Sequence, residues 1–182
     1  MAGHFAILLR GVNVGGRNRL PMKDLVAALE GAGATEVTTL LQSGNALFTA
    51  ERTNSEPIAL KAMRSLKSRV GFEPRFTLRS AAQLSRIARD HPLAAPGRDG
   101  ASLHVGFLAS KPTATALAAL KSKVGPDELL VSNGCELFIY YGKGAGRSRF
   151  TVDLIDRTLG TMCTMRNWNT ACALAVLSAR VH

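Results

Sequence analysis

The sequence predicts an α+β fold made of two ferredoxin-like subdomains with extra helices. Strand-like apolar runs and amphipathic helical stretches follow one another in the order β-α-β-β-α-β over residues 4–79, and the same order returns over residues 103–166. In each half, a turn rich in Ser, Gly and Asn separates the two middle strands, which is typical of a hairpin. The repeated order favours two related units.

In the first half, the apolar run Phe5–Leu9 predicts a buried strand, and Pro21 suits the first turn of a helix that Gly31 or Gly33 ends. The elements expected next are strands over Val37–Leu41 and Ala46–Thr49, a helix from Glu56 to Val70, a strand over Phe72–Leu78 and a connecting helix from Ser80 to about Asp90.

The second half is expected to repeat this pattern and to add a terminal helix. Its predicted strands are Leu103–Leu108, Leu129–Val131, Glu136–Tyr140 and Met162–Met165, and its predicted helices are Thr113–Val124, Thr151–Leu159 and a last helix that Asn169 or Thr170 caps and that runs to Ala179.

A stretch between the halves, Leu93–Ala101, is rich in Pro, Gly and Ala and has no periodicity, as expected of a linker. We therefore expect an N-terminal ferredoxin-like subdomain with its connecting helix at residues 1–92, a linker at 93–102, and a C-terminal plait-like subdomain with the terminal helix at 103–182.

The composition is that of a soluble globular protein, with 182 residues, 46% of them hydrophobic and 20% charged. The net charge of +10 favours nucleic acid, phosphate ligands or acidic surfaces as partners, although charge spread along the chain also fits a solvated basic face. Three cysteines without a CxxC pair indicate reduced thiols in a cytoplasmic protein. No apolar run approaches the ~20 residues of a membrane span, so no membrane association is expected.

The most polar segment follows the first strand, where Arg, Asn and Gly alternate without an acid. Its glycines could let backbone N–H groups converge on an anion, its arginines add charged donors, and the next helix N-terminus adds a favourable dipole. The alternative is a structural loop whose glycines serve tight turns. The spacing matches neither a phosphate-binding Walker loop nor a dinucleotide fingerprint. The ligand-binding residues predicted here are Arg10, Asn13, Gly15, Gly16, Arg17 and Asn18.

Two further segments complete the predicted site. The hairpin tip with Gln42, Ser43 and Asn45 is expected to border it. Near the other end of the chain, Thr164–Thr170 is expected to be a polar segment after a strand. There Arg166 could hold a phosphate or carboxylate, Asn167 and Asn169 could donate to a ligand, and Trp168 could stack on a base. The equally good alternative makes the asparagines helix caps and the tryptophan a core anchor. We expect this segment and the first one to meet.

The sequence contains few patterns typical of catalytic or metal-binding sites. The basic loop Tyr141–Arg149 fits single-strand binding or, more simply, a mobile solvated loop. The four histidines are isolated, and Asp153 and Asp156 lack a third ligand, so no metal site is predicted and the cofactor stays unknown. Whether the protein is an enzyme stays open.

Three polar segments of the chain resemble those of the DUF1697 family of uncharacterised proteins. The match rests on Leu9–Gly16 with Arg17-Asn18-Arg19 and Pro21-Met22, on Gln42–Asn45, and on Thr164–Thr170, in the family's order. The resemblance implies an α+β fold with ferredoxin-like parts in a bacterial cytosolic protein, and it implies no activity. The residue types favour binding of a phosphate-bearing ligand, a nucleotide or nucleic acid. The alternatives are an enzyme that acts on a phosphorylated or nucleotide substrate, and a structural or interaction protein without a ligand.

Overall fold

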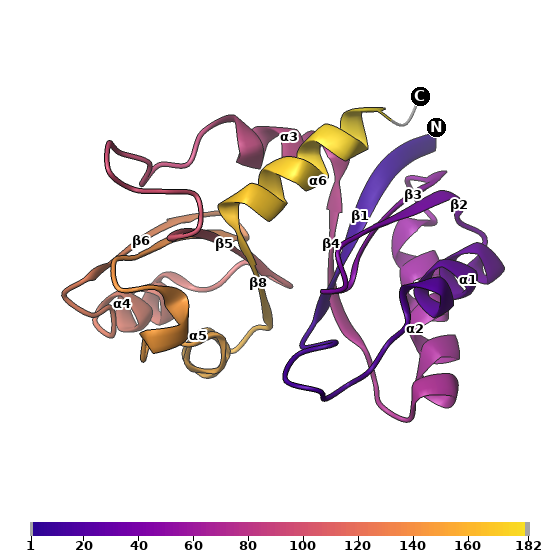
Figure 1. The fold of residues 1–182 in the computed structure, drawn as a ribbon, viewed down its shortest axis with the longest axis horizontal. Coiled ribbons are helices and arrows are strands. Elements are labelled where there is room, and N and C mark those ends of the chain that lie inside the picture. The colour runs from indigo at the N-terminus through magenta and orange to yellow at the C-terminus, as the bar shows by residue number, and fades with distance from the viewer. Residues whose placement is uncertain (1, 181–182) are drawn as a thin grey trace. The chain divides into compact units, whose positions relative to one another are not determined.

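The computed structural model describes residues 2–180, which form two compact units (Figure 1). Of these residues, the first unit takes those up to Ser85 and those from Leu174 onward, and the second takes Arg86–Ala173. The described residues contain two four-stranded antiparallel sheets and six α-helices, so the expected α+β class is confirmed. None of these helices is both long and apolar enough to cross a membrane.

The first unit packs two helices on one face of its sheet (Figure 1). The strand order in the sheet is β2-β3-β1-β4. In the core, Ile7, Leu9 and Phe48 from the sheet pack with Leu25 and Leu66 from the helices. The elements are β1 (Ala2–Arg10), α1 (Met22–Ala32), β2 (Thr35–Leu40), β3 (Asn45–Glu51), α2 (Ser55–Val70) and β4 (Arg75–Ser80).

Local sequence explains where these helices start and stop. Gly33 ends α1 with φ at 111°, a value that L side chains rarely adopt, and its N–H bonds the Glu30 carbonyl at 2.9 Å. Ser80 and Gln83 form a reciprocal cap at the start of the next helix, α3 (Ala81–Arg89): the Ser80 N–H donates to the Gln83 side chain and the Gln83 N–H to the Ser80 hydroxyl.

The second unit follows the same plan, with strand order β6-β7-β5-β8. Its core brings Leu137 and Ile139 of the sheet against Leu120, Phe150 and Ile155. The elements are β5 (Leu103–Leu108), α4 (Ala114–Lys121), β6 (Glu128–Asn133), β7 (Glu136–Tyr141), a 3-10 turn (Ala145–Arg147), α5 (Val152–Leu159), β8 (Cys163–Asn167) and α6 (Trp168–Arg180).

The division between the units differs from the expected boundaries. It falls after Ser85, inside α3, and helix α6 starts in the second unit and ends in the first. The expected linker at 93–102 has no helix or strand, but its residues are part of the second unit.

Equivalent hydrogen bonds recur in the two units. In each unit, a backbone N–H near the end of the first strand donates to a carbonyl in the hairpin turn. In the first unit Leu9 donates to Gly44 at 2.7 Å, and in the second unit Leu108 donates to Cys135 at 2.8 Å. On the last strand, Arg79 and Arg166 each donate from Nη1 to the carbonyl of the residue before them, at 2.8 and 2.9 Å. These matches support the related units that the sequence predicts.

The connection after the first strand breaks this likeness. In the second unit, β5 and α4 are joined by residues 109–113, whereas in the first unit β1 and α1 are joined by residues 11–21. Connections of two to six residues are usual between such elements. The longer loop, Gly11–Pro21, is therefore the feature that distinguishes the first unit, and we call it the arginine loop.

Candidate functional site

The arginine loop is a small hairpin. The Arg17 N–H donates to the Val14 carbonyl at 3.0 Å, and the Asn13 N–H donates to the Asn18 carbonyl at 3.1 Å. Gly15 and Gly16 form the turn between them, with φ at 58° and 75°. Two consecutive positive φ values are typical of a tight hairpin turn and differ from the alternating conformations of an anion-binding nest. The glycines thus have the structural role that the sequence left open.

Asn13 clamps this loop to the rest of the unit. Its Nδ2 donates to the Leu20 carbonyl at 2.8 Å and to the Gln42 carbonyl at 2.7 Å, and its Oδ1 accepts the Leu20 N–H at 2.8 Å. These bonds use both amide hydrogens and the oxygen. Asn18 adds a bond from Nδ2 to the Gly11 carbonyl at 2.9 Å. Both asparagines have positive φ, which Asn tolerates better than most residues, so they act as scaffold.

The hairpin tip between β2 and β3 lies beside the loop, as expected. Gly44 makes this close approach possible: a Cβ there would lie 2.5 Å from Val12 Cγ2 and 2.7 Å from Leu9 Cβ. Asn45 is buried and donates from Nδ2 to the Leu40 carbonyl at 2.8 Å and to the Ser43 hydroxyl at 3.0 Å. The Gln42 side chain is exposed. The structure thus brings the first two predicted segments together.

The positive charge of this surface is displayed outward. Arg17 and Arg19 are exposed, while Arg10 is half-buried at the end of β1. No Asp or Glu occurs between residues 1 and 23 or between residues 37 and 50. The loop and the hairpin tip beside it therefore contribute positive charge and no acid of their own to this surface, which favours an anionic ligand.

The segment Thr164–Thr170 is a strand followed directly by a helix, and the expectation of a polar segment after a strand is wrong. Local hydrogen bonds account for two of its polar side chains, Arg166 and Asn167. Arg166 lies in β8 and donates to the Met165 carbonyl, and burial lowers the pKa of its guanidinium to about 10. Asn167, rather than Asn169 or Thr170, caps α6, because its Oδ1 accepts the Thr170 N–H at 2.9 Å.

Trp168 packs against a buried histidine. The His91 ring, 2% exposed, meets the Trp168 and Phe138 rings edge-on, with centroids 5.0 and 5.1 Å away. This contact supports the core-anchor interpretation of the tryptophan. Asn169 is exposed, and its side chain lies over Gly100, where a Cβ would be 2.2 Å from its Oδ1. The loop and this segment belong to different units, so their sharing one site stays a prediction.

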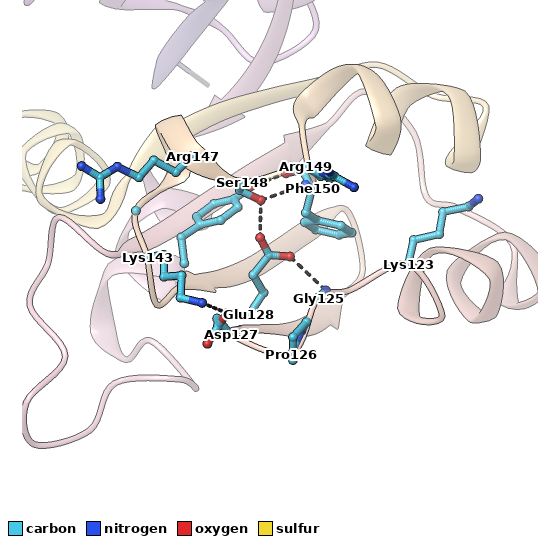
Figure 2. Close-up of a pocket in the computed structure, with 12 residues that line it drawn as sticks. Lys123, Gly125, Pro126, Asp127, Glu128, Lys143, Arg147, Ser148, Arg149 and Phe150 are labelled. Carbon is cyan, nitrogen blue, oxygen red and sulfur yellow. Dashed lines mark hydrogen bonds and ion pairs between the residues drawn. The ribbon is translucent and has the colours of Figure 1, made fainter.

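The basic loop after β7 lines a cavity of about 300 Å³ in the second unit (Figure 2). Ser148 donates to Glu128 Oε1 and accepts the Phe150 N–H at 2.8 Å, while Glu128 Oε2 accepts the Gly125 N–H at 3.0 Å. Lys143 pairs with Asp127 at 2.7 Å. Sequence reasoning missed Glu128, because nothing near it in the chain signals a partner twenty residues away.

This cavity is a poor site for an anion. Figure 2 shows the Glu128 carboxylate between Ser148 and Gly125, with the Lys123 and Arg147 side chains directed away from it. A carboxylate there repels a second negative charge. Its hydrogen bonds indicate that Glu128 anchors the basic loop, which the sequence had suggested to be mobile.

No described cluster of three or more His, Cys, Asp or Glu side chains is arranged to hold a metal ion. Of the two aspartates weighed above, Asp156 accepts the Cys163 N–H at 2.7 Å through Oδ1. The surface formed by the arginine loop and the hairpin tip is the candidate site that the predicted residues make up.

Substituting Gly44→Ala should destabilise the first unit strongly. The positive φ of 76° costs a side chain roughly 1–2 kcal/mol, and the clash with Leu9 and Val12 adds about 1–3 kcal/mol. Gly15→Ala is the matched control, because its φ is also positive but nothing lies within 4 Å of the new Cβ. Urea unfolding should show the larger loss for Gly44→Ala. Equal losses would contradict the close approach of the hairpin to the loop.

Acidification should destabilise the second unit through His91. Its Nδ1 accepts the Leu93 N–H at 3.2 Å and its Nε2 lies 3.2 Å from the His104 carbonyl, so the ring is neutral with the proton on Nε2. Burial lowers the pKa of His91, partly offset by the His104 carbonyl and Asp90. The unfolded chain therefore binds more protons below about pH 6.5, and stability falls as pH drops through that value.

Thermal unfolding between about pH 7.5 and pH 5.5 measures this effect. The variant His91→Gln, which keeps a donor and an acceptor but does not titrate, should lose less stability than the wild type over this interval. His104, whose pKa is also lowered by burial, should leave a residual loss. An equal pH dependence in both proteins would show that His91 is not the group responsible.

Comparison with known proteins places the chain in a family. Residues 2–138 match the model of a family described as protein of unknown function (DUF1697). No curated protein matches the chain. Among solved structures, it is similar to the conserved bacterial protein SP0830 from Streptococcus pneumoniae, with a TM-score of 0.75 and 22% identity over 99% of this chain and 100% of that chain, which shows the same fold.

The ligand-free regulatory subunit of aspartate kinase from Thermus thermophilus superimposes with a TM-score of only 0.29, at 14% identity over 87% of this chain and 91% of that one, and supports no argument. The family model covers well over half of the sequence, including the arginine loop and the hairpin tip. The protein is therefore a member of the DUF1697 family of proteins of unknown function.

Proposed function

We propose that the protein binds a phosphate-bearing ligand, a nucleotide or nucleic acid, through the arginine loop. One observation carries the proposal: a long loop in the first unit is fixed by asparagine hydrogen bonds while its arginines stay exposed. A preordered loop loses little entropy on binding, so its charged groups can contribute more of their interaction energy to affinity.

The residues of the loop have different proposed roles. Arg17 and Arg19 pair with phosphate oxygens, since guanidinium groups suit bidentate phosphate recognition. Asn13 and Asn18 hold the loop in place, and Gly15 and Gly16 make its turn. Arg166, Asn167 and Trp168 have contacts within their own unit that support structural roles, so the proposal rests on the loop alone.

The exposed form of the loop favours an extended ligand. Small-molecule sites are usually concave pockets that enclose most of the ligand. Residues 14–19 are all exposed instead. With a net charge of +10, this supports nucleic acid over a free nucleotide. An enzyme acting on a phosphorylated substrate could use the same arginines to stabilise charge, but residues 11–21 include no His, Asp or Glu to act as acid or base.

Two further expectations from the sequence, the fold of each unit and the cellular location, are also proposals. We propose that each unit is a ferredoxin-like plait, which the element order β-α-β-β-α-β and the matching strand orders support. We also propose a cytoplasmic location. The three cysteines, all within the described residues, form no disulfide, which supports a reducing compartment.

Arg17→Ala and Arg19→Ala should each weaken binding of a fluorescein-labelled oligonucleotide. A hydrogen bond to a charged group contributes roughly 1.5–3 kcal/mol, so the loss should be about tenfold or more. The slope of log affinity against log salt should shrink by about 0.7–0.9 per arginine. Titrations followed by fluorescence anisotropy between about 50 and 200 mM salt measure both quantities.

Arg64→Ala is the matched control, because Arg64 is an exposed arginine on α2 of the same unit. It should change affinity much less than either loop substitution. Equal effects of all three variants would mean that only net charge matters. An oligonucleotide that does not bind even at the lowest salt would exclude nucleic acid as the ligand.

A further inference from the structure

Leu41, at the hairpin tip, breaks two local rules at once. Its φ is 61°, a left-handed conformation that leucine rarely adopts, and its side chain is 59% exposed. Glycine or asparagine would fit this backbone better, and the exposed side chain gains little from packing. Strained positions of this kind cluster at functional sites. The leucine therefore points to a role outside the fold.

A second exposed aliphatic residue lies on the adjoining loop. Val14, at the start of the arginine-loop turn, is 64% exposed. It directly follows Asn13, and Leu41 directly precedes Gln42, so the 2.7 Å bond from Asn13 to the Gln42 carbonyl holds their two segments side by side. Both residues are thus presented on neighbouring, tightly connected turns of one unit.

The charge around these two residues indicates their partner. The exposed Arg17 and Arg19 belong to the same loop as Val14, and the acid-free stretches 1–23 and 37–50 supply no competing negative charge. A partner that fits must combine negative charge with accessible apolar faces. Single-stranded nucleic acid has both, because its phosphates are regularly spaced and its bases are unstacked.

We propose that Val14, Arg17, Arg19 and Leu41 form a binding surface for single-stranded nucleic acid. The arginines pair with the phosphates, and the two aliphatic side chains bury apolar area against the faces of unstacked bases. In a duplex those faces are stacked and inaccessible, so single strands bind more tightly. This inference rests on the proposed function and adds the form of nucleic acid to it.

The test compares substitutions that change the apolar residues but not the charge. Leu41→Asn and Val14→Ser should each weaken binding of a labelled 15-nucleotide oligothymidylate by about fivefold or more, because each removes apolar area that is buried against a base. The salt slope should stay unchanged, since no phosphate contact is lost. Leu41→Asn should keep or raise Tm, because asparagine suits the positive φ. Leu60→Asn is the matched control: Leu60 is 43% exposed on α2.

The outcomes separate this inference from the proposed function. Oligothymidylate binding that falls with Arg17→Ala but not with Leu41→Asn or Val14→Ser overturns the inference and leaves phosphate binding intact. Equal affinity for a 15-base-pair duplex also overturns it. A labelled Glu/Leu-rich peptide that binds more tightly than the oligonucleotide, and loses affinity with Leu41→Asn, would show that the surface recognises an acidic protein segment instead.

Discussion

The candidate site depends on the hydrogen bonds of one side chain. The Asn13 amide joins the start of the arginine loop to its end at Leu20 and to the hairpin tip at Gln42. Without these bonds an eleven-residue connection would pay a considerable ordering entropy before it could bind anything. With them, polar residues that would otherwise favour a mobile loop form a fixed surface. The arginines can then be exposed without being disordered.

The two units show how a repeated fold can carry one site. Both connect their first strand to the hairpin turn through an equivalent N–H bond, and in both the arginine of the last strand donates to the preceding carbonyl. These shared features stabilise each unit by itself. The long loop, the left-handed Leu41 and the asparagine clamp belong to the first unit. The candidate site therefore lies in features specific to that unit and not in the hydrogen bonds that both units share.

Much of the fold could be predicted, because strands and helices here follow hydrophobic periodicity and local caps such as Gly33. The site was less accessible to sequence reasoning. Asn13 and Gln42 are 29 positions apart, and nothing local shows that an amide bonds that carbonyl. Gly15 and Gly16 suit both a tight turn and an anion-binding nest, so their residue type does not distinguish the two. Arg166 and Asn167 looked like loop residues because they are polar. Arg166 instead pairs with β5 as part of a strand, and Asn167 caps α6, and neither role requires an apolar residue.

Amide hydrogen exchange of the variant Asn13→Ala tests the central claim most directly, because this variant removes the clamp and no charge. The amides of Arg17 and Leu20 should exchange at least about tenfold faster than in the wild type, while those of β1 and β3 keep their protection. Oligonucleotide affinity should fall in parallel, although every arginine remains. Asn169→Ala, at an exposed position in the second unit, should change neither quantity. Unchanged loop exchange in Asn13→Ala would contradict the account.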